Sequence, residues 1–178
     1  MNDRPFVSDV KKLRERARQH IENGAVTAGY GADRETVLKL LNEALATELV
    51  CVLRYKEHYF TASGIHAQSV AQEFLVHANE EQGHADQLSQ RIVQLGGRPN
   101  HNPEGLTSRS HSEYAQGDTL LGMITENLIA ERIAIDSYRE MINYLDKSDP
   151  TTRRMLEGIL AVEEEHAEDM ASLLSELK

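Results

Sequence analysis

Two copies of a Glu-x-x-His motif occur in the sequence, one in each half of the chain. A single glutamate precedes each copy by about the length of one long helix, and the two intervals are nearly equal. The chain thus reads as two similar halves, which together supply enough carboxylates and imidazoles to bind two metal ions. In chain order the six residues are Glu48, Glu81, His84, Glu131, Glu163 and His166.

The positions of these residues favour metal binding over a solvated face. Each glutamate interrupts the apolar stripe of a predicted helix near its middle, and the i, i+3 spacing places Glu and His side by side on one face. A buried carboxylate without a partner is costly, and two divalent cations would remove that cost. A single Glu-x-x-His on a charged helix is usually exposed to solvent, but two copies in register are hard to obtain by chance. Mixed carboxylate and imidazole ligands suit iron or manganese.

The elements that position the ligands are four long helices. Apolar periodicity and capping residues predict helices over residues 34–62, 66–95, 117–145 and 150–177. The connection 96–117 is long enough to cross between parallel helices of a bundle, and its segment SRSHSEYA could form a short helix. Strand patterning is absent. The predicted fold is an all-α four-helix bundle with a long crossover and an extra N-terminal helix.

Residues 1–33 are predicted to be separate from the bundle, which we place at 34–178. We expect a flexible arm over 1–8 and a helix over 8–22. The segment 1–20 contains six Lys or Arg against three acids, a net charge of +3, so the remainder carries −13 of the overall −10. The acidic bundle disfavours nonspecific nucleic-acid binding, whereas the basic N-terminus could contact DNA.

Other residues near the motifs could support the site or could simply pack in the core or face solvent. His77 is either a core histidine or a step on a route for iron. Tyr55 lies on the same side as Glu48 and could hydrogen-bond a ligand or donate an electron. Cys51 is expected to be a small buried hydrophobe. Three further glutamates fall off the apolar stripes and are expected to face solvent: Glu80, Glu164 and Glu165.

Four segments resemble the ferritin superfamily, specifically its bacterioferritin and Dps-like branch. They are LNEALATELVCVLRY, NEEQGHAD, NLIAERIAIDSY and ILAVEEEHAEDM, within a match that covers about residues 34–176. The resemblance implies a ferritin-like bundle in which the six residues named above bind two iron ions per subunit. It further implies that Glu81 and Glu163 bridge the ions, that Glu48 and His84 are terminal ligands, and that Tyr55 is the tyrosine of the site.

The chain also departs from the family pattern. Gln82 stands where bacterioferritins carry the haem-ligating Met, so no haem is expected. Thioferritin-type members carry a cysteine pair, and here Cys51 is alone. The sequence continues only as far as Lys178 after His166, which leaves no room for the fifth helix of 24-subunit ferritins. Together with the long 96–117 connection, this favours a hollow shell of twelve subunits.

The leading functional hypothesis is a ferroxidase that oxidises Fe(II) with hydrogen peroxide or O2 and stores the ferric product, which would protect against oxidative stress. One alternative is a Dps-like protein that binds DNA through its basic N-terminus. Another is a di-iron or di-manganese peroxidase without storage. The N-terminus lacks an apolar leader, and no run of about 18 apolar residues occurs, so we expect a cytoplasmic protein without a membrane partner.

Overall fold

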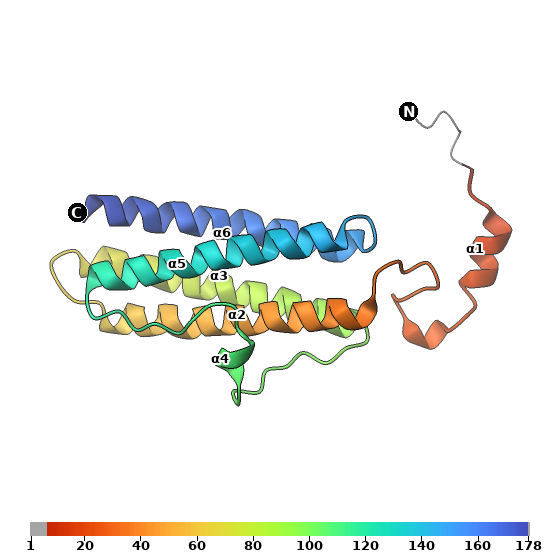
Figure 1. Cartoon of the computed structure of the whole chain (residues 1–178), viewed down its shortest axis with the longest axis horizontal. Helices are drawn as coiled ribbons and strands as arrows, with labels where there is room; N and C mark the ends of the chain where they lie inside the picture. The colour runs from red at the N-terminus through yellow and green to blue at the C-terminus, as the bar shows by residue number, and fades with distance from the viewer. Residues whose placement is uncertain (1–6, 178) are drawn as a thin grey trace.

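Four long helices form the body of the molecule. In the computed structural model, which describes residues 7–177, they are α2 (Arg34–Thr61), α3 (Ala67–Gln94), α5 (Leu120–Leu145) and α6 (Pro150–Glu176). They lie side by side, with α2 and α3 forming one antiparallel hairpin and α5 and α6 the other (Figure 1). Helices α3 and α5 run in the same direction because the crossover returns along the bundle. The predicted all-α bundle with a long crossover is confirmed.

The helix starts follow from capping side chains. Asp33 Oδ1 accepts a hydrogen bond from the Thr36 amide at 2.7 Å, and Asp149 caps α6 with Pro150 at its first position. Helix α5 begins later than predicted, at Leu120, because Thr119 is its cap. Gly117 instead takes a left-handed conformation (φ 67°), and a Cβ there would lie 2.8 Å from the Met123 backbone nitrogen. Gly117 therefore belongs to the tight entrance to the helix.

The bundle core consists of two apolar clusters. One packs around Leu41, Leu88 and Leu156, and the other around Phe74 and Ile124. The four glutamates and two histidines of the predicted site are buried between them. The helices are thus anchored by apolar packing on both sides of a polar layer, which gives the layer a fixed geometry.

The crossover is fixed to the bundle by a buried arginine. Arg54 is 0% exposed and donates to Ser112 Oγ (3.0 Å), to the Glu113 carbonyl (3.0 Å) and to Asn127 Oδ1 (2.9 Å). The crossover also contains a short helix, α4 (Leu106–Arg109). The prediction of a helix in SRSHSEYA is wrong for most of that segment: α4 ends at Arg109, and Ser112 and the Glu113 carbonyl beyond it accept hydrogen bonds from Arg54.

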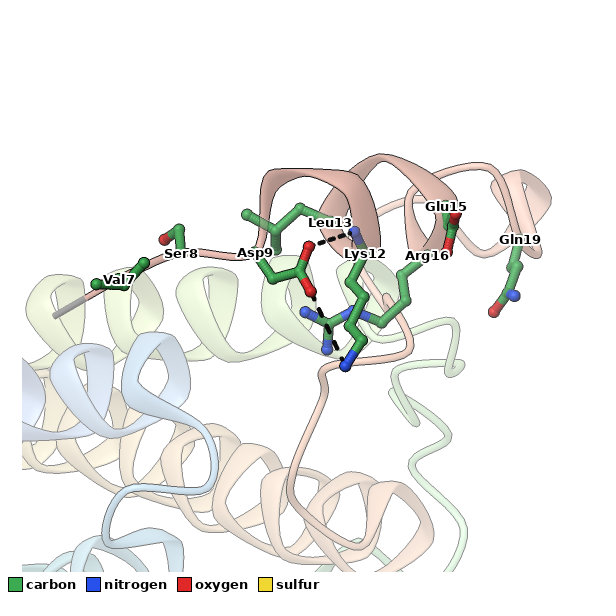
Figure 2. Close-up of a pocket in the computed structure, with 8 residues that line it drawn as sticks. All are labelled: Val7, Ser8, Asp9, Lys12, Leu13, Glu15, Arg16 and Gln19. Carbon is green, nitrogen blue, oxygen red and sulfur yellow. Dashed lines mark hydrogen bonds and ion pairs between the residues drawn. The ribbon is translucent and has the colours of Figure 1, made fainter.

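The N-terminal segment contains α1 (Val10–Arg16) and a 3-10 turn, η1 (Ile21–Asn23). In Figure 2, Asp9 accepts from the Lys12 amide at 3.1 Å and caps α1. The same view shows the residues lining a hollow of about 560 Å³ beside this helix.

This N-terminal helix is shorter than the predicted 8–22, and none of its residues is buried. No apolar packing supports it, and isolated helices shorter than about 12 residues are marginal. Residues 1–6 of the predicted flexible arm lie outside the described part of the chain, as does Lys178. The division into an N-terminal segment 1–33 and a bundle 34–178 stays a prediction.

Within residues 7–177, none of the helices has the length and apolar character needed to cross a membrane.

Candidate metal centre

All six predicted ligands converge at the middle of the bundle. Each of the four long helices contributes one glutamate, and α3 and α6 each add the histidine one turn later. Every one of these side chains is buried, with at most 4% of any residue exposed. His84 Nδ1 lies 2.9 Å from Glu163 Oε1 and 3.2 Å from Glu81 Oε2. His166 Nδ1 lies 3.6 Å from Glu81 Oε1.

The ligands form two overlapping groups with donor atoms within 4.8 Å of one another. One contains Glu48 and His84, and the other contains Glu131 and His166. Glu81 and Glu163 belong to both groups. This geometry agrees with two ions that share two bridging carboxylates, each ion having its own terminal glutamate and histidine.

The chemistry of the donors fits divalent cations. Among the described residues, several buried polar atoms of the site have no hydrogen-bond partner, although unpaired polar atoms are costly inside a protein. An ion coordinated at the centre would satisfy them. They are Glu81 Oε1, Glu131 Oε2, Glu163 Oε1 and His166 Nδ1.

Burial and the neighbouring carboxylates change the pKa values of several groups in the site. Burial and the charge of Glu81 raise the pKa of Glu48 to about 8. Burial favours the neutral ring of His84, yet its contacts with the carboxylates of Glu163, Glu48 and Glu81 raise its pKa to about 12. The pKa of His166 likewise rises to about 11 against the effect of burial. The raised pKa values of Glu48, His84 and His166 mean that these groups hold their protons more tightly, and metal ions would displace the protons.

Two tyrosines donate hydrogen bonds to the terminal glutamates of the opposite hairpin. Tyr55 of α2 donates to Glu131 Oε1 of α5, and Tyr138 of α5 donates to Glu48 Oε1 of α2. The structure therefore places Tyr55 beside the predicted ligands. Tyr138 was missed as a site residue, although its spacing from Glu131 is the same as the spacing of Tyr55 from Glu48.

Glu80 contacts the ligand histidine His166, although its position off the apolar stripe predicted only exposure to solvent. Its side chain is 47% exposed, which agrees with a residue facing solvent, but Oε2 lies 2.8 Å from His166 Nε2. A carboxylate on the outer nitrogen of a ligating histidine fixes the ring and leaves Nδ1 for the metal. This contact depends on the rotation of α3 against α6, which the spacing of residues within one helix does not reveal.

Other singled-out residues lie around the centre. His77 is buried, and its ring stacks on His166 with centroids 3.9 Å apart. Cys51 is buried as predicted, and burial raises the pKa of its thiol. Gln82 is exposed and donates to Asp86 Oδ1 at 3.0 Å. The expectation that no haem binds stays a prediction.

The chain is similar to known proteins over most of its length. The chain is 30% identical to the nutrient stress-induced DNA-binding protein of Synechococcus sp. over 138 residues, 76% of this chain and 78% of that protein. It is 25% identical to a bacterioferritin of Desulfovibrio desulfuricans, with coverage of 85% and 82%.

Among solved structures, it is similar to a dodecameric thioferritin, the bacterioferritin-related protein of Bacteroides fragilis. The TM-score is 0.79 at 30% identity, over 83% of this chain and 89% of that one. The profile of the Ferritin family, described as Ferritin-like domain, matches residues 38–178. Because this match includes nearly all of the four long helices and every residue of the buried centre, the chain belongs to the Ferritin family.

Proposed function

We propose that the protein is a ferroxidase that oxidises Fe(II) with hydrogen peroxide or O2 at a dinuclear centre within each subunit. The observation that carries the proposal is the sharing of Glu81 and Glu163 by two buried ligand groups. Two Fe(II) ions held by one centre supply the two electrons that, together with two protons, reduce hydrogen peroxide to two water molecules or O2 to hydrogen peroxide. The protein side chains position these ions and balance their charge.

The protein side chains set the separation and the charge of the centre. Glu81 and Glu163 would hold the two substrate ions close together, while His84 and His166 each bind one ion through a neutral Nδ1. The protons that these histidines carry in the metal-free protein would leave as iron binds. Tyr55 and Tyr138 orient the terminal carboxylates, and each leaves one carboxylate oxygen available.

We further propose that the ferric product is stored inside a hollow assembly of twelve subunits. The similarity to a dodecameric thioferritin supports this assembly. Consuming Fe(II) and peroxide together would limit the formation of hydroxyl radicals, so protection from oxidative stress follows.

Stopped-flow absorbance of Fe(II) oxidation tests the centre. We expect Glu81→Ala and His84→Ala each to abolish the rapid phase with hydrogen peroxide and with O2. Glu165→Ala is the matched control, because Glu165 is exposed and lies beside the ligand His166 on α6. Unchanged rapid oxidation in both centre variants would show that the assignment is wrong.

The assembly is tested by size-exclusion chromatography with light scattering, before and after addition of Fe(II) and peroxide. A species near twelve subunits that gains an iron core is the expected result. A monomer or dimer that consumes peroxide without accumulating iron would instead identify a peroxidase without storage.

DNA binding is a second candidate function, because α1 presents exposed basic side chains. Helix α1 and the two residues that follow it contain five exposed basic residues: Lys11, Lys12, Arg14, Arg16 and Arg18. Twelve such segments on one shell would bind phosphates by avidity despite the acidic bundle. A gel shift at low salt should be lost on deletion of residues 1–24. No shift with the full-length protein would exclude this function.

A further inference from the structure

A second group of potential metal ligands lies beside the centre, on the surface between α3 and α6. Glu73 and His77 are one turn apart on α3, and Asp169 lies one turn after His166 on α6. His77 Nε2 is 3.5 Å from Glu73 Oε1 and 3.5 Å from Asp169 Oδ2. The donor atoms of the three residues all lie within 4.8 Å of one another. None of them belongs to the ligand set of the dinuclear centre.

The burial of this group differs between its members. The His77 side chain is 1% exposed, whereas those of Glu73 and Asp169 are 39% and 45% exposed. The imidazole nitrogen is thus fixed within the protein, while the two carboxylates form an opening to solvent. A hydrated cation can reach the carboxylates without any rearrangement of the bundle.

The hydrogen bonds of His77 define which nitrogen faces this opening. The Tyr55 hydroxyl donates its proton to Glu131, so its oxygen accepts from Nδ1–H of His77 at 3.2 Å. In the neutral imidazole, Nε2 then carries a lone pair. With this tautomer, Nε2 and the two carboxylate oxygens are three potential ligand atoms gathered at one place. A cation bound there would be coordinated by all three.

The internal symmetry of the bundle shows that the fold does not require these groups. The shift along the sequence that superposes the Glu-x-x-His of α3 on that of α6 also pairs other positions of the two helices. It pairs Glu73 with Met155, His77 with Ile159, and Gln87 with Asp169. Ile159 is 1% exposed and packs in the apolar core. The position of His77 is therefore compatible with a hydrocarbon side chain, and the imidazole is a feature of one half only.

We propose that Glu73, His77 and Asp169 form an accessory site for one divalent cation, separate from the dinuclear centre. Two carboxylates and one imidazole, completed by water, suit ions such as Fe(II), Mn(II) and Zn(II). The site adjoins the centre in two ways: the His77 ring stacks on His166, and His77 reaches Glu131 through Tyr55. The proposal concerns binding alone and does not require that the protein oxidise iron.

The test uses the full-length protein, Zn(II) as a redox-inactive probe, and two measurements. Isothermal titration combined with metal analysis after dialysis counts the bound ions. Anomalous scattering at the zinc edge locates them in crystals. The test variant is Glu73→Gln/Asp169→Asn, which alters only partly exposed side chains. The matched control is Asp86→Asn/Glu168→Gln, which removes the same charge from other positions on the same two helices.

The wild type and the control should bind one Zn(II) per subunit more than the test variant, or bind it at least about tenfold more tightly. The additional anomalous peak should lie between Glu73, His77 and Asp169. His77→Ile, which copies the residue at Ile159, should lose the same ion. An unchanged count and affinity in the test variant, or no peak at this position in the wild type, would overturn the proposal. Because the six ligands of the centre are retained throughout, failure here is distinguishable from failure of the dinuclear site.

Discussion

In each terminal glutamate, Glu48 and Glu131, one carboxylate oxygen accepts a hydrogen bond from a tyrosine and the other oxygen does not. Tyr55 engages Glu131 Oε1, and Oε2 of that carboxylate has no hydrogen-bond partner within the described residues. Tyr138 engages Glu48 Oε1, while Oε2 lies 3.5 Å from His84 Nδ1. A tyrosine hydroxyl thus fixes each carboxylate in rotation and leaves one oxygen directed at the centre. This arrangement reduces the reorganisation that metal binding requires.

Tyr55→Phe and Tyr138→Phe are each expected to weaken Zn(II) or Fe(II) binding by about tenfold or more, because the carboxylate loses its orienting donor. The two variants should resemble each other, since the tyrosines occupy equivalent places in the two halves. Tyr144→Phe removes an exposed hydroxyl from α5 and should have no effect. Competition with a chromophoric chelator measures the affinities. Wild-type affinity in both centre variants would contradict the orienting role.

The ligand positions were predictable because each combines a buried place on a helix with a residue type that binds metal ions. A glutamate in the middle of an apolar stripe violates the expected pattern, and the violation repeats at Glu48, Glu81, Glu131 and Glu163. The contact of Glu80 with His166 was not predictable, since it links two helices and depends on their relative rotation. Tyr138 could have been found from its spacing after Glu131, but a tyrosine on an apolar stripe is equally typical of core packing.

At the scale of elements, one end of the bundle is joined by a buried ion pair. Arg91 of α3 donates to Asp149 Oδ1 at 2.9 Å and Oδ2 at 3.1 Å, linking the two hairpins. Tyr30, from the segment before α2, donates to the same carboxylate at 2.9 Å. Burial acts to raise the pKa of Asp149, but hydrogen bonds from Thr152 and Tyr30 and the charge of Arg91 lower it.

Stability should therefore depend on the ionisation of Asp149. Its folded-state pKa lies below the unfolded value of about 3.9, so its contribution is complete above that value and is lost as the pH falls through the folded pKa. Asp149→Asn should cost about 3 kcal/mol at pH 7, because it leaves Arg91 buried without its partner, and the loss should shrink toward pH 3.

Urea unfolding between pH 3 and pH 7 measures this dependence. Asp146→Asn is the control, because Asp146 pairs with Arg153 at the surface and its side chain is 68% exposed. That change should cost less than about 1 kcal/mol. A loss for Asp149→Asn that is equal at both ends of the pH range would exclude the ionised carboxylate as its cause.

The crossover should depend on Arg54. Arg54→Met retains much of the buried volume but leaves Ser112, the Glu113 carbonyl and Asn127 without their donor, so we expect a loss of about 3 kcal/mol. Amide hydrogen exchange should rise across residues 110–116 more than in α2. Arg132→Met, at an exposed position of α5, should change neither quantity. Unchanged exchange in the crossover would show that other contacts hold it.

The long helices were predictable from periodicity and capping, whereas the short segments were not. Asp33 and Asp149 define helix starts by local hydrogen bonds, which the sequence alone reveals. The path of residues 110–116 depends on a buried arginine from another part of the chain. Helix α1 is shorter than its composition suggests, since its apolar residues Val10 and Leu13 remain about half exposed and no packing extends it.

At the scale of the whole molecule, we expect the polar layer to make the free energy of unfolding depend on bound metal. The layer concentrates four carboxylates between two apolar clusters, and both ligand groups include residues of both hairpins. Zn(II) at about a thousand times its dissociation constant should stabilise the wild type by about 4 kcal/mol. Glu81→Gln/Glu163→Gln should gain far less from Zn(II), because it removes the two carboxylates that belong to both ligand groups.

Thermal unfolding with and without Zn(II) after treatment with a chelator provides this comparison. Glu164→Gln/Glu165→Gln serves as the control, since it changes the same number of carboxylates at exposed positions of α6. Equal stabilisation of all three proteins by Zn(II) would place the stabilising ion outside the centre.

The repeated arrangement of the two halves has an evolutionary meaning. Residues 34–95 contain a buried glutamate, Glu48, a tyrosine two turns after it and a Glu-x-x-His motif, and α5 with α6 contain the same set. Two copies of a single ancestral hairpin would hold every ligand of the centre, so duplication and fusion account for the site without a separate origin for each half. The crossover is then the joint between the copies. His77 in one half corresponds to Ile159 in the other, so on this account the two copies have since diverged at this position.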